Sequence, residues 1–205
     1  FLKEKGWSIS ELNKLINRSA RAAGLYTKTA AATSAIALQT VLAQKYNIRL
    51  PYWWGGKSWS YGAKTNWGEY RYKINDNTGR EYLYDGLDCS GFTTWAYVNA
   101  GYDIGSVTNK YGVYFDAWWK QRIDFDEGEI GDFLVYNDNR NNRHVKLIVG
   151  KTSTGYITAE SAGGDEGMIV STHEFSKAGK YKVEKAELLM NAYSKFSKSQ
   201  YPMGF

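Results

Sequence analysis

The sequence contains a single cysteine, and its neighbours suggest that it could act as a nucleophile. Cys89 stands in the segment Gly86-Leu87-Asp88-Cys89-Ser90-Gly91-Phe92. Asp88 and Ser90 are helix-capping residues, so we predict a short helix that begins near Cys89 and ends at Gly101. At a helix N-terminus, unpaired N–H groups and the macrodipole favour the thiolate, the form that attacks carbonyl carbons. The alternative is an inert cysteine buried as a small apolar side chain.

Two histidines are candidates for the imidazole that such a cysteine needs for acyl transfer. His144 opens a segment of alternating apolar and polar residues, so its ring can face a cleft at the edge of a sheet. His173 closes a similar segment, next to Glu174. We predict that His144 is the partner of the cysteine, with a purely structural histidine as the alternative.

The sequence offers no pattern for a metal or cofactor site. One cysteine and two histidines without paired spacing cannot assemble an ordinary four-ligand zinc site. The acidic run 124–129 lacks the ligand spacing of a calcium loop, and we interpret it as a solvated turn. We therefore expect no metal and no other cofactor.

Two helices are predicted ahead of the cysteine. Ser8-Ile9-Ser10-Glu11 is a capping-box pattern, and apolar residues continue on one helical face as far as Gly24. A second, alanine-rich helix is predicted from Thr29 to Tyr46. Both helices are expected to be packing elements.

The second half of the chain alternates with the period of β-strands. Val145, Leu147 and Val149 should share one face of a strand, and His144 and Lys146 the other. The complete set of expected strands is a hairpin over 69–84 and strands at 131–136, 143–150, 154–161, 167–173 and 181–189. Helices followed by an antiparallel meander predict an α+β fold.

Length and charge limit the function classes. The 205 residues suffice for one core, or for one domain with a helical extension. The formal charge of +5 is scattered rather than gathered in a stripe, which argues against nucleic-acid binding. No apolar run approaches the ~18 residues that a membrane span needs. Because the sequence lacks an initiating methionine and a signal peptide, we expect it to be part of a longer polypeptide.

Four segments carry a family resemblance, and in order they are 52–56, 87–92, 130–135 and 144–150. With them the chain resembles the NlpC-type cysteine peptidases, papain-like enzymes that cut the stem peptides of bacterial peptidoglycan. The resemblance covers roughly residues 35–189. It implies an α+β, papain-like fold in which N-terminal helices, one of them begun by the nucleophilic cysteine, pack on an antiparallel β-sheet.

The resemblance also implies catalytic roles. Cys89 corresponds to the nucleophile and His144 to the general base and acid, and Tyr52 would help to shape the oxyanion site with the Cys89 N–H. A third polar residue, usually histidine in the family, orients the catalytic histidine from the next strand. Here that position falls to Thr158 or Glu160, which share a face. A carboxylate holds an imidazolium better than a hydroxyl does, so we favour Glu160.

Other positions are implied in substrate binding or structure. Asp88 and Ser90 resemble the pair that lines the substrate pocket and, in some members, holds a free amine of the stem peptide. Trp54 is expected to contact substrate as well. Asp132 is expected to fix the turn into the first strand of the sheet. Lys146 departs from the family pattern, because a small residue is common two places after the histidine.

The expected organisation is an N-terminal helical extension at 1–28 followed by one compact peptidase domain at 29–205. A hairpin insertion near 57–85, longer than usual for the family, could form one wall of the cleft and influence specificity. No second domain is expected within the sequence.

The resemblance implies a cell-wall hydrolase, specifically a cysteine endopeptidase whose partner is a peptidoglycan stem peptide. The expected location is extracellular or at the cell wall, or in a phage or conjugation apparatus. Two alternatives stay open. One is a non-catalytic wall-binding module in which aromatic residues grip glycan, and the other is an amidase or acyltransferase on the same scaffold.

Overall fold

The computed structural model describes residues 9–40, 43, 49–52, 70–74, 81–84, 86–104, 122–137, 143–163 and 166–197. The helices are α1 (Ile9–Ala22), α2 (Lys28–Thr40), α3 (Cys89–Asn99) and α4 (Glu187–Ala192), with the 3-10 turns η2 (Phe125–Glu127) and η3 (Phe175–Lys177). The strands are β1 (Tyr70–Ile74), β2 (Glu81–Tyr84), β3 (Arg122–Ile123), β4 (Phe133–Asn137), β5 (Arg143–Lys151), β6 (Gly155–Ala162), β7 (Gly167–Glu174) and β8 (Tyr181–Glu184).

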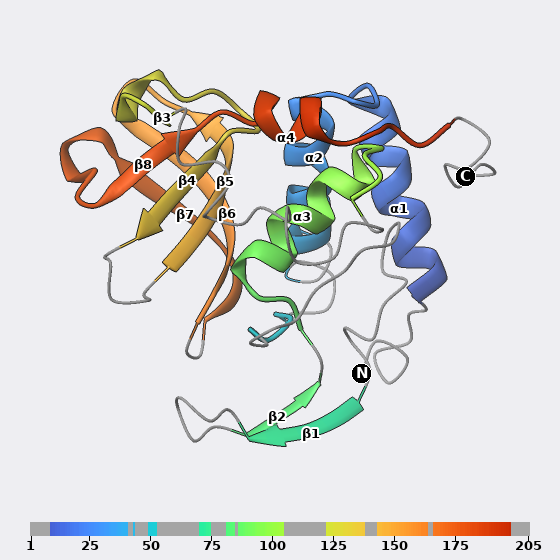
Figure 1. The fold of residues 1–205 in the computed structure, drawn as a ribbon. Coiled ribbons are helices and arrows are strands. Elements are labelled where there is room, and N and C mark those ends of the chain that lie inside the picture. Colours follow the sequence, from blue (N-terminus) through green and yellow to red (C-terminus); the bar gives the residue numbers. More distant parts are fainter. Residues whose placement is uncertain are drawn as a thin grey trace.

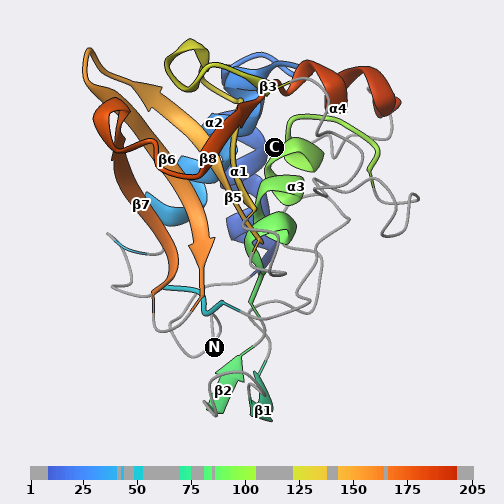
Figure 2. The same ribbon diagram turned by 60° about the vertical axis from the view of Figure 1, so that its left-hand side comes forward.

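The described chain forms two layers, helices beside a twisted sheet (Figures 1 and 2). Six antiparallel strands lie in the order β3-β8-β4-β5-β6-β7, and α2 and α3 pack on one face of this sheet. The predicted hairpin is present as β1 and β2, which lie apart from the sheet beyond the N-terminal end of α3 (Figure 1). The helices-then-sheet order confirms the predicted α+β class.

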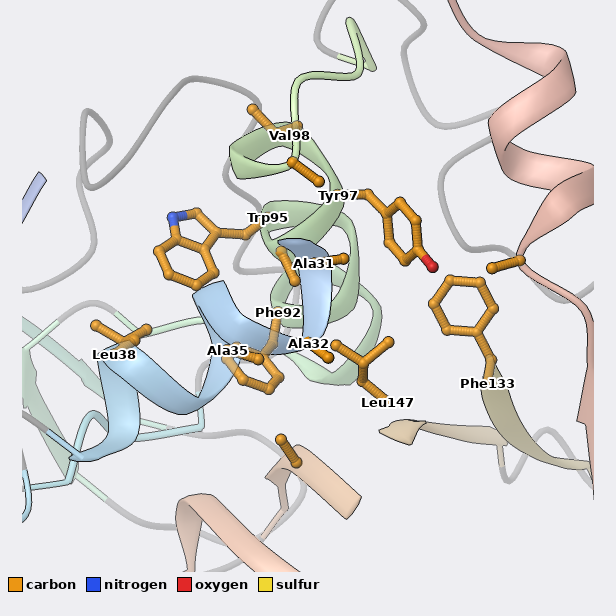
Figure 3. Close-up of a cluster of buried hydrophobic side chains, with 14 of the residues drawn as sticks. Ala31, Ala32, Ala35, Leu38, Phe92, Trp95, Tyr97, Val98, Phe133 and Leu147 are labelled. Atoms are coloured by element: carbon orange, nitrogen blue, oxygen red, sulfur yellow. The ribbon is translucent and has the colours of Figure 1, made fainter. Parts of the chain in front are cut away.

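Helix α3 is the central packing element. All of its residues are buried, including Phe92 and Trp95. The helix is therefore covered on every side, in agreement with its position between α2 and the sheet. Figure 3 shows Tyr97 of α3 pointing toward Phe133 of β4, with 5.4 Å between their ring centroids. The helix ends before Gly101, whose φ of 106° fits the predicted terminator.

Helices α1 and α2 complete the core. Ala31 and Ala35 of α2 are fully buried, and their small side chains allow close approach to α3 (Figure 3). Ile16 of α1 joins the same core cluster. The predicted end of the second helix at Tyr46 lies outside the described residues. The proposed boundary between an extension and a domain at residue 28 stays a prediction.

The two faces of the sheet bury different clusters, as the alternation in the sequence predicts. Val145 and Leu147 of β5 pack in the main core under the helices. Ile148 belongs to a smaller cluster on the opposite face. His144 and Lys146 alternate with the core residues, and therefore share the face of Ile148.

The predicted strand 181–189 is wrong in its second half. Strand β8 ends at Glu184, and residues 187–192 form α4 instead. Leu189 of α4 is buried in the main core, so packing favours the helix over further pairing. The strand order also departs from a simple meander, because β8 returns to pair with β4 rather than with β7.

Asp132 joins three parts of the fold, in line with the structural role expected for it. Its buried carboxylate accepts hydrogen bonds from Lys28 Nζ (3.0 Å), Glu129 N (2.9 Å) and Ala186 N (2.9 Å). Lys28 is the first residue of α2, Glu129 lies in the turn before β4, and Ala186 directly precedes α4. Burial lowers the pKa of Lys28, but its hydrogen bonds to Glu129, Glu187 and Asp132 outweigh burial and raise that pKa overall.

No helix in the described parts of the chain combines the length and apolar character needed to cross a lipid bilayer.

Candidate active site

Cys89 is the first residue of α3, as the capping pattern predicts. Asp88 is the N-cap, and its Oδ1 accepts hydrogen bonds from Gly91 N (2.6 Å) and Ser90 Oγ (3.0 Å). This cap fixes the start of the helix and thus the position of the sulfur. Cys89 is buried, with 6 % of the residue exposed.

His144, near the start of β5, contacts both Cys89 and Glu160. Its Nε2 donates to Glu160 Oε2 at 2.6 Å, and its ring also hydrogen-bonds the side chain of Cys89. Because Glu160 occupies Nε2, Nδ1 is the nitrogen left for the sulfur. Side chains from α3, β5 and β6 therefore meet in the order sulfur, imidazole, carboxylate, which a cysteine hydrolase requires.

The charge of His144 follows from these contacts. Burial alone lowers the pKa of His144, because a charged ring loses solvation. The hydrogen bonds and negative charges of Cys89 and Glu160 outweigh burial and raise the pKa to about 9. At neutral pH the ring is therefore an imidazolium, the form that can protonate a departing amine.

Glu160 of β6 is almost fully buried and uses both of its oxygens. While Oε2 accepts from His144, Oε1 accepts from Lys146 Nζ and Ser171 Oγ, each at 2.7 Å. Burial alone raises the pKa of Glu160, but these hydrogen bonds and the charge of Lys146 lower it to about 2. The carboxylate is thus ionised throughout the range in which a cysteine hydrolase would work.

Thr158, the other candidate for the third position, does not contact His144 through any described hydrogen bond. Its hydroxyl instead pairs with Ser171 Oγ at 2.9 Å. Since Ser171 in turn donates to Glu160, Thr158 is connected to the carboxylate only indirectly, through the Ser171 hydroxyl. Contact with His144 thus favours Glu160 over Thr158, and the catalytic role of either residue stays a prediction.

Tyr52 reaches the same region through the backbone. It forms an isolated parallel bridge with Leu87, two residues before the cysteine, and its side chain is half-buried. Close packing holds this segment in place, because a Cβ at Gly86 would lie 1.7 Å from Pro51 O. Ser161 Oγ donates to Leu87 O at 2.6 Å and ties the approach to α3 to strand β6.

The remaining predicted residues fall into two groups. Asp88 and Ser90 are buried at the helix start and hydrogen-bonded to each other, so their described contacts are those of a cap. Trp54 lies outside the described residues. The second histidine, His173, packs at 4.7 Å from the ring of Tyr181 and donates to Lys177 O at 3.0 Å. Its position is that of a structural side chain.

Two residues of the site had no assigned role in the sequence analysis. Ser171 alternates on β7 without any motif around it, and only its pairing opposite Thr158 reveals its contact with Glu160. Lys146 stood out in the sequence as a departure from the family pattern. The pairing of β5 with β6 shows that its partner is Glu160. No group of three His, Cys, Asp or Glu side chains that could hold a metal ion occurs among the described residues.

A cysteine at the start of a buried helix, facing a histidine on an antiparallel sheet, defines the class of papain-like cysteine hydrolases. A family model described as the NlpC/P60 family matches residues 49–182. The match covers well over half of the chain, and the chain belongs to the NlpC/P60 family, whose members are cell-wall hydrolases and generally cysteine peptidases or amidases. No curated protein and no solved structure matched the chain.

Proposed function

We propose that this protein is a cysteine endopeptidase that cleaves peptide bonds in peptidoglycan stem peptides. The observation that carries the proposal is the simultaneous contact of His144 with Cys89 and Glu160. Membership of the NlpC/P60 family supports the substrate class.

The proposed mechanism begins with attack of the Cys89 thiolate on a peptide carbonyl. The oxyanion that forms is stabilised by the Cys89 N–H at the helix start, where the first N–H groups have no acceptor within the helix, with Tyr52 beside it. The His144 imidazolium then gives its proton to the departing amine, and a thioester remains. Neutral His144 next takes a proton from water, which attacks the thioester and releases the carboxylic acid and the cysteine.

Glu160 contributes to this cycle by stabilising the imidazolium and holding its ring in one orientation. A hydroxyl at this position, such as that of Thr158, could orient the ring but would not compensate its charge. The 2.6 Å hydrogen bond from His144 to Glu160 supports the carboxylate as the third catalytic group.

Substrate binding is proposed at the start of α3. Asp88 and Ser90 lie directly beside the nucleophile, and a free amine of a stem peptide would meet the carboxylate of Asp88 there. Trp54 is proposed to contact the peptide as well. We further propose that the protein works at the cell wall, outside the cytoplasm or as part of a phage or conjugation apparatus. A net charge of +5 suits attraction to a polyanionic wall.

Digestion of purified peptidoglycan tests the proposal. Wild-type protein should release peptides with new amino termini, which mass spectrometry identifies together with the bond cleaved. Cys89→Ala and His144→Gln should release none, because each lacks a group that takes part in the bond changes.

His173→Gln is the matched control, since it removes the other histidine of the chain, whose described hydrogen bond goes to Lys177 O rather than to a proposed catalytic group. It should digest the wall as wild type does. Equal binding to the wall by wild type and Cys89→Ala, without release from either, would instead identify a binding module. Release of whole stem peptides, with no stem residue left on the lactyl groups of the glycan, would identify an amidase.

A further inference from the structure

Among the described residues, Lys146 is a charged neighbour of the predicted catalytic groups to which the proposed mechanism assigns no step. It stands two residues after His144 on β5 and faces Glu160 across the β5–β6 pairing, in which Leu147 lies opposite Ala159. Its Nζ donates to Glu160 Oε1 at 2.7 Å. The side chain of Lys146 is 14 % exposed and that of Glu160 4 %, so this ion pair is largely shielded from solvent.

Contacts on the other side of Lys146 hold it toward the carboxylate. Its Nζ lies 5.3 Å from the centre of the Tyr181 ring, over the ring face. A cation over an aromatic ring is stabilised there, and the ring restricts the directions in which the ammonium can turn. Ser171 donates to the same oxygen, so Glu160 Oε1 is bound by two donors.

The charges of the four groups alternate. In the resting state that the mechanism needs, they are Cys89 thiolate, His144 imidazolium, Glu160 carboxylate and Lys146 ammonium. Without the lysine, this row of shielded charges would carry a net negative charge, which burial disfavours. With it, the row is neutral.

We propose that Lys146 is a positioning residue that acts through Glu160: it holds one carboxylate oxygen so that the other faces His144, and its positive charge limits how basic His144 becomes. The inference about proton affinity stands on these contacts alone. Its consequence for catalysis rests on the proposed function.

The direction of the effect follows from the charges around the imidazole. Glu160 and Cys89 favour the protonated ring, whereas Lys146 shares Glu160 and adds a nearby positive charge. When the lysine is removed, no positive charge beside Glu160 counteracts the negative charges of Glu160 and Cys89, so His144 should keep its proton to a higher pH. The hydrolysis step, which needs a neutral ring, would then require a more alkaline solution.

Other titratable groups face this site from the neighbouring strands. Tyr181 of β8 and Tyr136 of β4 lie with ring centroids 5.5 Å apart, and His173 of β7 packs against Tyr181. Burial and the charges of Glu160 and Cys89 raise the pKa of Tyr181, so that ring stays neutral through the pH range of interest. His173 is the group whose titration must be separated from that of His144.

Proton NMR titration of the histidine rings provides a test that needs no substrate. The chain has only two histidines, and His173→Gln assigns their signals. Lys146→Met should raise the titration midpoint of His144 by about one pH unit. Lys146→Arg, which keeps the charge, should leave the midpoint close to that of wild type.

Lys177→Met is the matched control. It also removes a lysine from a Lys–Glu pair, but that pair with Glu174 is exposed, at 72 % and 52 % of the two side chains. It should not move the midpoint of His144. Thermal unfolding of each variant checks that it is folded, and Lys146→Gln replaces Lys146→Met if the methionine variant does not fold.

An unchanged midpoint in the folded, uncharged Lys146 variant would overturn the proposal, as would an equal shift in Lys177→Met. Wall digestion separates this outcome from failure of the proposed function. If wild type releases no peptides but the midpoint moves as expected, the function fails and the role of Lys146 stands. If wild type digests the wall and the midpoint does not move, only the role of Lys146 fails.

Discussion

At the scale of single residues, Glu160 is the side chain that contacts both positively charged groups of the site, His144 and Lys146. It binds His144 through one oxygen and Lys146 and Ser171 through the other. Truncating one partner of such a shielded group leaves the others without a counter-charge, which costs more than the pair itself contributes. The stability of the fold should therefore depend on pH through these side chains.

The sign of that dependence follows from the two pKa shifts. The pKa of His144 rises from 6.5 to about 9 on folding, so its contribution is complete below pH 6.5 and is lost as pH rises through about 9. The pKa of Glu160 falls from 4.5 to about 2, so its contribution is present above pH 4.5 and is lost as pH falls through about 2. Both are complete between pH 4.5 and 6.5.

Glu160→Gln should accordingly lower the free energy of unfolding by about 3 kcal/mol at pH 6, and by about 1 kcal/mol less at pH 10. Urea unfolding at the two pH values measures the difference. Glu174→Gln, in the exposed pair with Lys177, should cost under about 1 kcal/mol at both. Equal costs of Glu160→Gln at pH 6 and pH 10 would contradict the assigned ion pair.

At the scale of elements, helix α3 positions the nucleophile. Its apolar surface is buried on all sides, so neighbouring helices and the sheet fix its axis. Asp88 fixes its first turn through the hydrogen bond from Gly91 N. The position of Cys89 thus depends on both packing and capping, and Asp88 combines a capping role with its proposed role in binding an amine.

Substitutions of Asp88 separate these two roles. Asp88→Ala should lower the free energy of unfolding by about 1 kcal/mol, the usual cost of losing a cap. Asp88→Asn keeps a side-chain oxygen for Gly91 N and should be close to wild type in stability. If the carboxylate also binds a substrate amine, Asp88→Asn should still raise the KM for stem peptides, measured in a peptide-release assay. An unchanged KM would leave Asp88 with capping alone.

At the scale of the whole molecule, the site depends on how helices and sheet are joined. Asp132, which is fully buried, links the starts of α2 and α4 to the turn before β4. Strand β4 in turn pairs with β5, which carries His144. A change in the position of β4 at the Asp132 contacts would therefore also move His144.

Asp132→Ala should lower the free energy of unfolding by about 3 kcal/mol, because it leaves three donors without their shared acceptor. Chemical denaturation measures this loss. Glu187→Gln is the control, since this residue also pairs with Lys28 but is 49 % exposed. It should cost under about 1 kcal/mol. A cost for Asp132→Ala as small as that of the control would show that the junction does not depend on this carboxylate.

Local patterns in the sequence determined the elements of the site. The cap at Asp88, the helical spacing behind it and Gly101 sufficed to place Cys89 at a helix start, because these signals act within a few residues. Alternation placed His144 and Lys146 on one face of β5 for the same reason. The end of β8 was not predictable in this way, since residues 187–192 form a helix whose start is fixed by distant Asp132.

Only the tertiary structure decided which side chains meet. Thr158 and Glu160 share a face of β6, and from the sequence alone either residue could be the one that orients His144. The register that sets Ile148 opposite Thr158 brings Glu160 to His144 and Lys146, whereas a slip of two residues would bring Thr158 there instead. Register arises from the pairing of whole strands and their packing against the helices. It is therefore a property of contacts between distant residues, which no local pattern in the chain encodes.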